Sequence, residues 1–417
     1  MRVLFTTTNW KGAYFCMIPL GWALTAAGHE VRVLCAPSQA PAISAAGLVP
    51  VPALKDIDMM VFERMARHAA VRSGAEPAGD GLPLLHPLTG RPLAHPDEYD
   101  AEEHGRAFLR ACEQIHRHNQ DAAVALARSR PPALVVHDLM SLEGPLAARV
   151  AGVPAVYHSP GMFGALETGL EDTHGAFARH GLGEWKPTQV SHFIDPTPPA
   201  LQPDAGPACR MPVRYLPYNG PGQPPRWTWS RPPRPRVCLL WSNSALEIYG
   251  PAVPALRHTV DAVTARGAEL VLTASAEQVD ALGELPDGVR VLRHFPVNLL
   301  LGTCDALIHQ GSVNPMMTAA TAGVPQLMLP FTDDQTEMSR RFGRAGSSLA
   351  LPGPTARRDE VEEAVTRLLD EGALREAAHR IRAGAERRPP VSALVGPLER
   401  LARGHDVRPA SRSEQKR

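Results

Sequence analysis

Short apolar runs alternate along this chain with longer segments in which apolar residues recur at helical spacing. Such runs, bounded by polar turns, are typical of parallel strands that are buried on both faces. The segments between them indicate amphipathic helices. This alternation predicts an α/β fold built on parallel sheets. The predicted strands cover residues 2–5, 31–35, 47–51, 132–136, 154–158, 237–241, 269–273, 289–292, 306–308 and 325–330.

The predicted helices lie between and after these strands. The first, over residues 17–27, tolerates Pro19 in its first turn, and Gly28 follows its end as a common helix terminator. Residues 72–99, by contrast, are rich in Gly, Pro and His, which predicts an irregular segment that is either a substrate loop or disordered. The predicted helices cover residues 17–27, 102–128, 142–151, 254–266, 316–322, 336–346, 359–372, 373–387 and 394–403.

A Pro-rich segment over residues 217–235 separates two halves of this pattern. Its sequence, with PGQPPRWTWSRPPRPR at the centre, suits neither a helix nor a central strand and predicts a linker. The chain has 417 residues, more than one ordinary domain. We therefore predict two Rossmann-like domains, over residues 1–216 and 236–388, that face each other across a cleft. Residues 389–417 would add a C-terminal helix and a polar tail, which is expected to be disordered.

The composition argues against nucleic-acid binding, a disulfide framework, a zinc site and membrane attachment. Lys and Arg number 43 and are balanced by 43 Asp and Glu, without a basic stripe, which disfavours nucleic acid. The 6 Cys are scattered without a CxxC pair, so neither a disulfide framework nor a zinc site is indicated. No signal sequence and no membrane-spanning apolar stretch is recognised. We therefore expect a cytoplasmic protein without membrane attachment, and a homodimer is left open.

Residues 305–335, DALIHQGSVNPMMTAATAGVPQLMLPFTDDQ, predict a strand, a turn, a helix and a second strand. Polar residues gather just past the two strands, at His309 to Ser312 and at Asp333 to Gln335. In doubly wound sheets, ligands bind at this edge. A Gly-Ser turn that opens a helix also presents backbone N–H groups and the positive end of a helix dipole, which suits a phosphate. From the turn alone, an ordinary βαβ unit with a polar loop is equally well supported.

Polar residues end other predicted strands as well. Asp138 is a candidate general base at such a strand end, with helix capping as an equally supported alternative. His158 ends the next strand and is expected to line the same crevice. In the second half, Ser242, Asn243 and Ser244 follow a strand, where hydroxyl groups commonly donate to phosphate and where an ordinary turn is equally well supported. The N-terminal strand and helix lack GxGxxG, which disfavours a nicotinamide or flavin cofactor.

Four motifs resemble the GT-B glycosyltransferases of actinobacterial natural-product pathways. These enzymes transfer deoxysugars from TDP-sugars to polyketide-like aglycones. The motifs are RVLF…IPLGWALTAAGHEV, HDLMSLEGPLAARVAGVPAVYH, RYLPYNGPG and HFPVNLLLGTCDALIHQGSVNPMMTAATAGVPQLMLPFTDDQ. The last matches the donor-site motif of the family without gaps, and the resemblance spans nearly the whole chain. It implies that the first domain binds the acceptor and that the second binds the nucleotide sugar.

The resemblance also implies a set of donor-binding residues at the strand ends of the second half. His309 matches the His that contacts the donor diphosphate, and Gly311 with Ser312 matches the Gly pair whose N–H groups support it. The complete set is Ser242, Asn243, Ser244, His294, Phe295, His309, Gly311, Ser312, Val313, Asp334 and Gln335.

The remaining donor contacts concern the sugar and the base. Asp334 and Gln335 match the acid–amide pair that holds the sugar hydroxyls. His294 and Phe295 fall where the family packs and hydrogen-bonds the base. The family needs no metal, because a helix N-terminus and a His stabilise the diphosphate leaving group. We therefore expect no cofactor and no metal ligand set, with the TDP-sugar as a substrate.

Two residues depart from the pattern of the family. Ala13 stands where the family usually has the His that deprotonates the acceptor, and alanine cannot take a proton. Pro315 stands where the diphosphate motif usually has Thr, and it supplies neither a hydroxyl nor an N–H. Gln310 and Ser312 replace a His and a Gly, which are milder changes.

The leading hypothesis is a glycosyltransferase that inverts the anomeric carbon by direct displacement, with Asp138 as the base. A phenolic acceptor loses its proton more readily than an alkyl alcohol, so a carboxylate could suffice. Besides His158, acceptor contacts are expected from Trp10, Tyr14, Phe15 and the irregular segment over residues 72–99.

The alternative belongs to another class of protein. Ala13 and Pro315 together are consistent with a glycosyltransferase-like partner that lacks catalysis and assists an active transferase. A nucleotide-sugar epimerase on the same layout is less well supported, because only Asp138 is clearly placed among the several acids that such a site needs. Binding of TDP would separate an intact donor site from a degenerate one.

Overall fold

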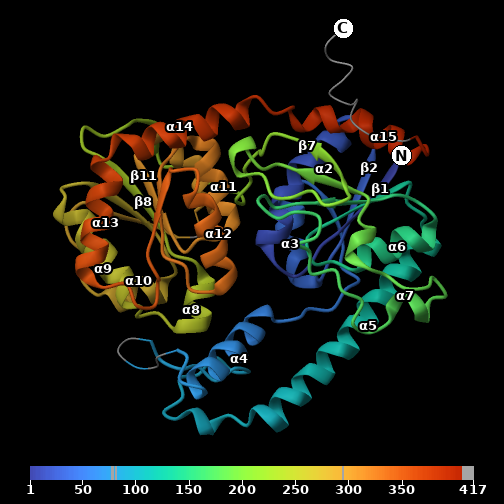
Figure 1. The fold of residues 1–417 in the computed structure, drawn as a ribbon, viewed down its shortest axis with the longest axis horizontal. Helices are drawn as coiled ribbons and strands as arrows, with labels where there is room; N and C mark the ends of the chain where they lie inside the picture. Colours follow the sequence, from blue (N-terminus) through green and yellow to red (C-terminus); the bar gives the residue numbers. More distant parts are fainter. Residues whose placement is uncertain (77–78, 80–81, 294, 406–417) are drawn as a thin grey trace. The chain divides into compact units, whose positions relative to one another are not determined.

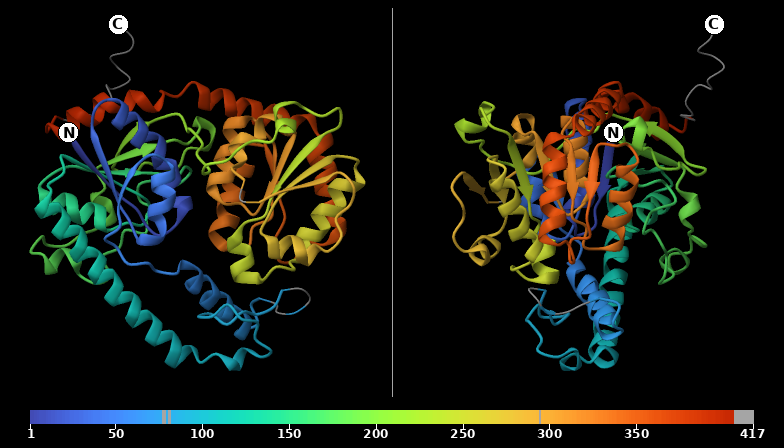
Figure 2. Two further views of the ribbon diagram at one scale, coloured as in Figure 1. Left: turned by 180° about the vertical axis from the view of Figure 1, so that it is seen from behind. Right: turned by 60° about the vertical axis from the view of Figure 1, so that its left-hand side comes forward.

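The computed structural model describes residues 1–76, 79, 82–293 and 295–405, which form two compact α/β units (Figure 1). The first unit comprises Met1–Ile57, Ala111–Gly220 and the chain from Gly384 onward. The second comprises Asp58–Arg110 and Pro221–Ala383. Each unit contains one parallel sheet with helices on both of its faces, as the two views in Figure 2 also show.

The sheet of the first unit has the strand order β3-β2-β1-β4-β5-β6-β7. Phe5 at its centre pairs with Val33 on one side and Val136 on the other. The order reverses between β1 and β4, so the loops after these two strands leave the same edge in opposite directions and open a crevice. The strands are β1 (Arg2–Thr6), β2 (Glu30–Leu34), β3 (Val49–Val51), β4 (Leu134–His137), β5 (Ala155–His158), β6 (His192–Asp195) and β7 (Cys209–Pro212).

The helices of the first unit bury apolar side chains against both faces of this sheet. On one face, Leu4 and Val135 of the sheet pack with Ala123 of α5 and Ala147 of α6. Helix α5 begins in the second unit, and α14 also runs from one unit into the other. The helices are α1 (Lys11–Tyr14), α2 (Ile18–Ala26), α3 (Ala40–Ala45), α5 (Arg106–Ser129), α6 (Glu143–Ala151), α7 (Ala176–Arg179) and α15 (Val395–Ala402). Helix α14 (Gly372–Glu386) lies mostly in the second unit and ends in the first.

The second unit repeats this design with a shorter sheet, in the order β10-β9-β8-β11-β12-β13. Its order reverses between β8 and β11, where Cys238 pairs with Leu307 inside a buried apolar cluster. The strands are β8 (Arg236–Leu240), β9 (Glu269–Thr273), β10 (Val289–Leu292), β11 (Ala306–His309), β12 (Gln326–Met328) and β13 (Ser348–Ala350). The helices are α4 (Met59–Arg72), α8 (Asn243–Tyr249), α9 (Pro254–Ala265), α10 (Ala276–Leu282), α11 (Val313–Ala322), α12 (Asp333–Gly343) and α13 (Arg358–Asp370).

Residues 58–110 pack with the second unit, although the sequence placed them in the first domain. Helix α4 carries Arg64 and Arg67, which are only 6% and 4% exposed. Their guanidinium groups donate to the backbone oxygens of Glu247 and Ile248 on α8, at 3.2 and 2.9 Å. Arg67 also lies 4.3 Å from the ring centroid of Tyr249. Buried guanidinium groups need such acceptors, so these two side chains fix the segment to α8.

Most of the predicted strands and helices are confirmed, with bounds that shift by a few residues. The prediction omitted α1, α3, α4, α7, α8, α10, β6, β7 and β13, and all of these except α4 are short. Residues 72–99 have no α-helix or strand beyond the end of α4 within the part that the structure describes. The expected disordered tail lies, from residue 406 onward, outside the described residues.

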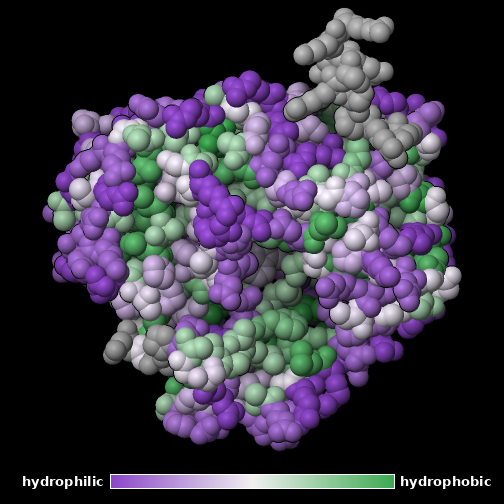
Figure 3. Space-filling model, viewed as in Figure 1, coloured by the Kyte–Doolittle hydropathy of each residue, from purple (hydrophilic) through white to green (hydrophobic). Residues whose placement is uncertain are grey.

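The surface is predominantly polar on the face drawn in Figure 3, with apolar residues gathered in smaller areas. Trp229, in the Pro-rich segment, is the most exposed of the large apolar side chains that are described, at 72%. No helix among the described residues is long and apolar enough to cross a membrane.

Candidate functional site

In each unit, one side chain links the two loops that leave the sheet where its strand order reverses. In the first unit, the Asp138 carboxylate after β4 accepts a hydrogen bond of 2.6 Å from the backbone N–H of Thr8 after β1. In the second unit, Oε1 of Gln310 after β11 accepts a hydrogen bond of 3.1 Å from the backbone N–H of Ser242 after β8. The two crevices are therefore built alike, and both lie where ligands bind to doubly wound sheets.

The Asp138 carboxylate is saturated with hydrogen bonds. Besides the Thr8 N–H, Oδ2 accepts from the Thr8 hydroxyl at 2.7 Å. Oδ1 accepts from the backbone N–H groups of Met140 and Ser141 at 3.0 and 2.8 Å. The side chain is 0% exposed. Asp138 thus holds the loop before α6 in place without capping that helix, whose N-cap residue is Leu142. Its role as a general base stays a prediction.

Burial dominates the electrostatics of this crevice. It raises the pKa of Asp138 above its ordinary value, and the four hydrogen bonds oppose that shift without cancelling it. Burial likewise raises the pKa of Glu143, which accepts from the Ser141 hydroxyl at 3.0 Å and lies near the charge of Asp138. A raised pKa makes a carboxylate a stronger proton acceptor.

Ala13 lies buried beside this crevice, where a titratable side chain was expected by resemblance. Its backbone oxygen accepts from the thiol of Cys16 at 3.2 Å. Burial, and then the nearby charge of Asp138, raises the pKa of that thiol, which therefore stays protonated at neutral pH. Neither residue can serve as a base, and the carboxylate whose charge acts on Cys16 is that of Asp138.

The predicted acceptor residues differ in their accessibility. Trp10 is half-buried and its indole lies over Gly12, where an added Cβ would be 2.5 Å from the indole nitrogen. Tyr14 and Phe15 are buried, and the Phe15 ring packs 5.1 Å from that of Tyr218. His158 is buried too, with Nδ1 3.0 Å from the backbone oxygen of Ser159.

The second crevice gathers most of the predicted donor-binding residues. Helix α11 begins directly after Ser312, which makes no side-chain capping bond, and its first turn contains no acidic residue. Gly311 has φ +84°, and its Cα lies so close to α12 that an added Cβ would be 2.7 Å from the Ser339 hydroxyl. Ser242 precedes α8, which begins at Asn243 and Ser244. The N-terminal end of α11 is thus open to an anion.

Several buried polar atoms around this crevice have no hydrogen-bond partner in the protein. Leaving a buried donor or acceptor unpaired costs about 1–3 kcal/mol, so such atoms are rare and call for a ligand or water. Here they come from the ends of the neighbouring strands β9, β8 and β11 and from α12, whose Ser339 lies close to Gly311 just before α11. They are Trp241 Nε1, Ser242 Oγ, Thr273 Oγ1, Gln310 Nε2 and Ser339 Oγ.

His309 is held inside the protein by both ring nitrogens. Nδ1 accepts from the Gly311 N–H at 3.1 Å, and Nε2 therefore carries the proton that it donates to Gln326 Oε1 at 2.9 Å. Gln326 in turn donates to the backbone oxygen of Met316 on α11, at 3.2 Å. In this structure the imidazole therefore fixes the Gly311 turn and the start of α11 in place.

The remaining predicted donor residues lie around the start of α12, apart from two in the segment before β11. Asp334 is exposed and accepts a short hydrogen bond from the Thr332 hydroxyl. Gln335 accepts from the Phe331 N–H at 3.0 Å. Phe295 is half-buried against the apolar cluster behind β8 and β11. His294 lies outside the described residues.

Glu63, which the sequence did not single out, also belongs to this region. It lies on α4, and burial, followed by the charge of Asp334, raises the pKa of its carboxyl group. The other residues that the sequence missed are Thr8, Gln278 and Ser339. Gln278 donates to the backbone oxygen of Ser242 at 3.1 Å. Of these residues, only Ser339 could have been identified from the sequence, because it lies one helical turn after Gln335 and therefore on the same face of the helix.

Three buried histidines predict how stability depends on pH. Burial lowers the pKa of His137, His158 and His309 from 6.5 to about 4. Between these values the unfolded chain takes up protons and the folded chain does not, so the free energy of unfolding should fall as the pH falls from about 6.5 to about 4. Each histidine contributes about 2–3 kcal/mol to this fall in the free energy of unfolding, since a shift of one pKa unit corresponds to about 1.4 kcal/mol.

Urea unfolding at pH 7.5 and pH 5.0 measures this loss directly. His137→Asn should reduce the loss, because it removes one of the three groups. His118→Asn, at an exposed position of α5, is the matched control and should lose as much as the wild type. Equal losses for His137→Asn and the wild type would contradict the assignment.

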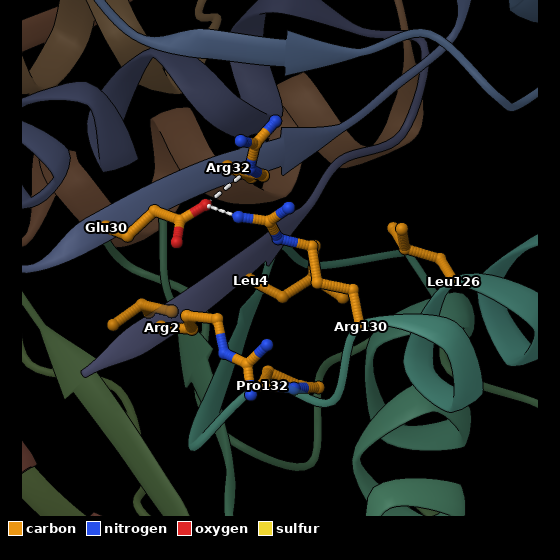
Figure 4. Close-up of a pocket in the computed structure, with 8 residues that line it drawn as sticks. Arg2, Leu4, Glu30, Arg32, Leu126, Arg130 and Pro132 are labelled. Carbon is orange, nitrogen blue, oxygen red and sulfur yellow. Dashed lines mark hydrogen bonds and ion pairs between the residues drawn. The ribbon is translucent and has the colours of Figure 1, made fainter.

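Two other hollows in the described part of the chain are poorer ligand sites. The first, at the amino ends of β1 and β2, is shown in Figure 4, where Glu30 lies between Arg32 and Arg130, at 2.6 and 2.5 Å. Its volume of about 20 Å³ holds little more than one water molecule. The second, of about 470 Å³, lies between α8 and the segment 82–92, and each nitrogen of its buried Arg64 already has a partner, in Pro87, Glu247 and Asp58. Neither offers an unpaired buried donor.

Comparison with known proteins assigns the chain to a family. The model of the N-terminal domain of erythromycin biosynthesis protein CIII-like proteins matches residues 22–79 and 111–241, and that of the C-terminal domain matches residues 257–401. The chain is 32% identical to 3-alpha-mycarosylerythronolide B desosaminyl transferase of Saccharopolyspora erythraea, covering 97% of this chain and 99% of that protein. It is 34% identical to L-demethylnoviosyl transferase of Streptomyces niveus, covering 93% and 95%.

Solved structures support the same assignment. The glycosyltransferase VinC in complex with dTDP matches with a TM-score of 0.72 and 29% identity, over 97% of this chain and 100% of that one. Spinosyn rhamnosyltransferase SpnG complexed with thymidine diphosphate matches with a TM-score of 0.74 and 26% identity, over 96% and 100%. The predicted GT-B architecture of two parallel-sheet α/β domains is confirmed, and the chain belongs to the erythromycin biosynthesis protein CIII-like family of natural-product glycosyltransferases.

Proposed function

We propose that this protein transfers a deoxysugar from a TDP-sugar to a polyketide-like or aromatic aglycone, inverting the anomeric carbon without a metal ion. The observation that carries the proposal is the set of unpaired buried polar atoms around the start of α11. A nucleoside diphosphate supplies the acceptors that these donors lack, and its negative charge suits a helix N-terminus. The relatives support the sugar class, since their names describe desosaminyl and demethylnoviosyl transfer.

In this proposal the diphosphate lies at the start of α11, between the loops after β8 and β11. The Ser242 hydroxyl and the Gln310 amide donate to phosphate oxygens, and the backbone at Ser312 and Val313 adds N–H groups. His309 holds this arrangement and reaches the phosphates only through Gly311. Because Pro315 gives no N–H in the first turn of α11, the serine and glutamine donors take a larger share of the binding.

The sugar lies toward α12, where Asp334 and Gln335 bind its hydroxyl groups. The half-buried Glu63 adds a second carboxylate to this region. We expect the thymine to pack against Phe295. No metal is needed in this scheme, because the charge that develops on the leaving diphosphate is met by the α11 dipole and by neutral donors.

The acceptor is proposed to bind at the crevice of the first unit, where Asp138 takes the proton of the attacking hydroxyl. We expect the acceptor contacts near this crevice to come from Trp10, Tyr14, Phe15 and His158. The attacking oxygen forms its bond to the anomeric carbon as the bond to the diphosphate breaks, so the configuration is inverted. An acceptor with an acidic phenol fits a carboxylate base better than an alkyl alcohol does.

The alternative, a catalytically impaired partner of another transferase, is motivated by Ala13 and Pro315. A test of TDP binding separates it from an enzyme with a working donor site. In a thermal unfolding assay, TDP at about 100 times its Kd should stabilise the wild type by about 2.7 kcal/mol. The assay is followed by incubation with TDP-sugars and phenolic or macrolactone acceptors, and the anomeric configuration of the product is read by NMR. Addition of EDTA should leave the rate unchanged.

The binding test has a matched pair of variants. Ser242→Ala removes an unpaired hydroxyl at the carboxyl edge of the sheet and should raise the Kd for TDP about tenfold, which corresponds to about 1.4 kcal/mol. Ser347→Ala removes a hydroxyl that is equally buried and unpaired, but at the amino edge before β13. It should leave the Kd unchanged. Absence of TDP binding in the wild type would contradict the proposal, and binding without transfer would favour the partner hypothesis.

A further inference from the structure

The crevice of the first unit contains a hydroxyl group that is hydrogen-bonded to the predicted base and belongs to a residue less buried than that base. This is the Thr8 hydroxyl, which donates to Asp138 Oδ2 at 2.7 Å. Asp138 is fully buried, whereas Thr8 is only partly buried. From this arrangement we infer that the Thr8 hydroxyl is the group that touches the acceptor, and that it passes the acceptor's proton on to Asp138. The inference rests on the proposed function.

The hydrogen bonds of Asp138 leave no place for a direct contact with the acceptor. A carboxylate has about four lone-pair sites. Two on Oδ1 are used by the N–H groups of Met140 and Ser141, and two on Oδ2 by the N–H and hydroxyl of Thr8. Three of these four donors are backbone amides, which do not exchange protons with an alcohol during catalysis. The Thr8 hydroxyl is therefore the one donor through which a proton can reach the carboxylate.

The loop that carries Thr8 is held in a fixed position. The backbone oxygen of Thr8 accepts from Gln39 Nε2 at 2.5 Å and from the Trp10 N–H at 2.8 Å. The next residue, Asn9, donates from its side-chain amide to the Asp56 carboxylate at 2.9 Å. No described residue donates to the Thr8 hydroxyl oxygen, so this oxygen keeps lone pairs for an incoming O–H. The fixed backbone and the bond to Asp138 orient the hydroxyl before an acceptor arrives.

The transfer balances in atoms and charge. The acceptor O–H gives its proton to Thr8 Oγ1 while the Thr8 proton moves to Asp138 Oδ2. The acceptor oxygen bonds to the anomeric carbon, and the electron pair of the breaking C–O bond leaves on the diphosphate. Thr8 ends the step as a neutral hydroxyl, and Asp138 ends it as a carboxylic acid. Such a relay would deprotonate the acceptor, which Ala13 cannot do because its side chain takes up no proton.

Three variants test the relay through the turnover number with a phenolic acceptor. Thr8→Val removes the hydroxyl at nearly constant volume and should lower kcat about ten- to hundredfold, because water replaces a positioned hydroxyl only in part. Thr8→Ser keeps the hydroxyl and should stay within about threefold of the wild type. Thr7→Val is the matched control, since the buried Thr7 hydroxyl donates to Leu34 O at 3.4 Å, away from Asp138. It should leave kcat unchanged.

A proton inventory in mixtures of H₂O and D₂O distinguishes proton transfer through Thr8 from a purely structural role of Thr8, because a structural role would not change the number of protons in flight. Two protons move in the relay, so the plot of kcat against deuterium fraction should be curved for the wild type and Thr8→Ser. A linear plot for the wild type would overturn the relay. So would a Thr8→Val enzyme with full kcat, or a Thr8→Ser enzyme as slow as Thr8→Val.

The outcomes of these experiments distinguish failure of the proposed function from failure of the relay. If the wild type transfers no sugar, both are overturned. If it transfers sugar with a linear inventory, the relay alone is overturned and Asp138 acts directly. Thermal unfolding of all three variants, with and without TDP, shows that the donor site is intact. Equal stabilisation by TDP therefore assigns any loss of kcat to the acceptor side.

Discussion

Replacing Asp138 by Asn is expected to lower kcat by about two to four orders of magnitude, the range that follows the loss of a general base. An amide takes up no proton at neutral pH, so neither direct transfer to residue 138 nor transfer through Thr8 would be completed. The KM for the TDP-sugar should change little, because Asp138 belongs to the other crevice. The measurement is steady-state kinetics with a phenolic acceptor, together with the Kd for TDP.

The fold also depends on Asp138, so the variant needs a control for lost structure. Asp195, at the end of β6, is likewise 0% exposed and accepts from the Thr197 N–H at 2.9 Å and from Arg210 at 2.5 Å. Asp195→Asn should lower the unfolding temperature and leave kcat within about threefold, since removing one partner of a buried pair is destabilising. Retention of full turnover by Asp138→Asn would exclude the base. An equal loss of kcat in both variants would indicate a structural effect.

Replacing Gly311 by Ala is expected to weaken TDP binding about thirty- to hundredfold. The residue has φ +84°, a conformation that costs a side chain about 1–2 kcal/mol. The new Cβ would also lie 2.7 Å from the Ser339 hydroxyl and 3.3 Å from the backbone oxygen of Gln335, so α12 would have to move. The backbone strain and the close contacts together should cost about 2–3 kcal/mol. This cost distorts the turn before α11, where the diphosphate is proposed to bind. Isothermal titration with TDP measures the change.

Gly323 provides the matched control at the opposite end of the same helix. Its φ is +72°, and an added Cβ would meet Arg382 at 3.0 Å. Gly323→Ala should therefore carry a similar strain and lower the unfolding temperature by a comparable amount, without changing the Kd for TDP. If both variants bind TDP equally well, the start of α11 is not the phosphate site.

The periodic part of the fold was predictable from the sequence, because each strand and each amphipathic helix carries its pattern locally. The position of residues 58–110 was not, since it depends on two arginines of α4 finding carbonyl groups on α8, about 180 residues further along the chain. The strands β6 and β7 were missed for a related reason. They are short and lie among Gly and Pro residues, so their pairing with the sheet, rather than their own pattern, defines them.

The candidate site was predictable where it follows from a strand end and not where it depends on a pairing across the sheet. The rule that ligands bind at the carboxyl edge identified Asp138, Ser242 and the turn after β11. It did not reveal that Asp138 is tied to Thr8, because the two residues lie 130 positions apart. Nor did it show that Phe15 packs against Tyr218, since an aromatic side chain near a loop has the same pattern whether it binds a ligand or fills the core.

The location of residues 58–110 also determines how halves of related enzymes can be recombined. A single crossover within the Pro-rich segment would pair α4 with a foreign α8, and Arg64 and Arg67 would then meet backbone and aromatic partners that did not evolve with them. A hybrid that exchanges the second unit should instead carry four junctions, near residues 57, 110, 220 and 383, so that α4 travels with Tyr249. Residues 58–110 and the crevice of the second unit would then be inherited together.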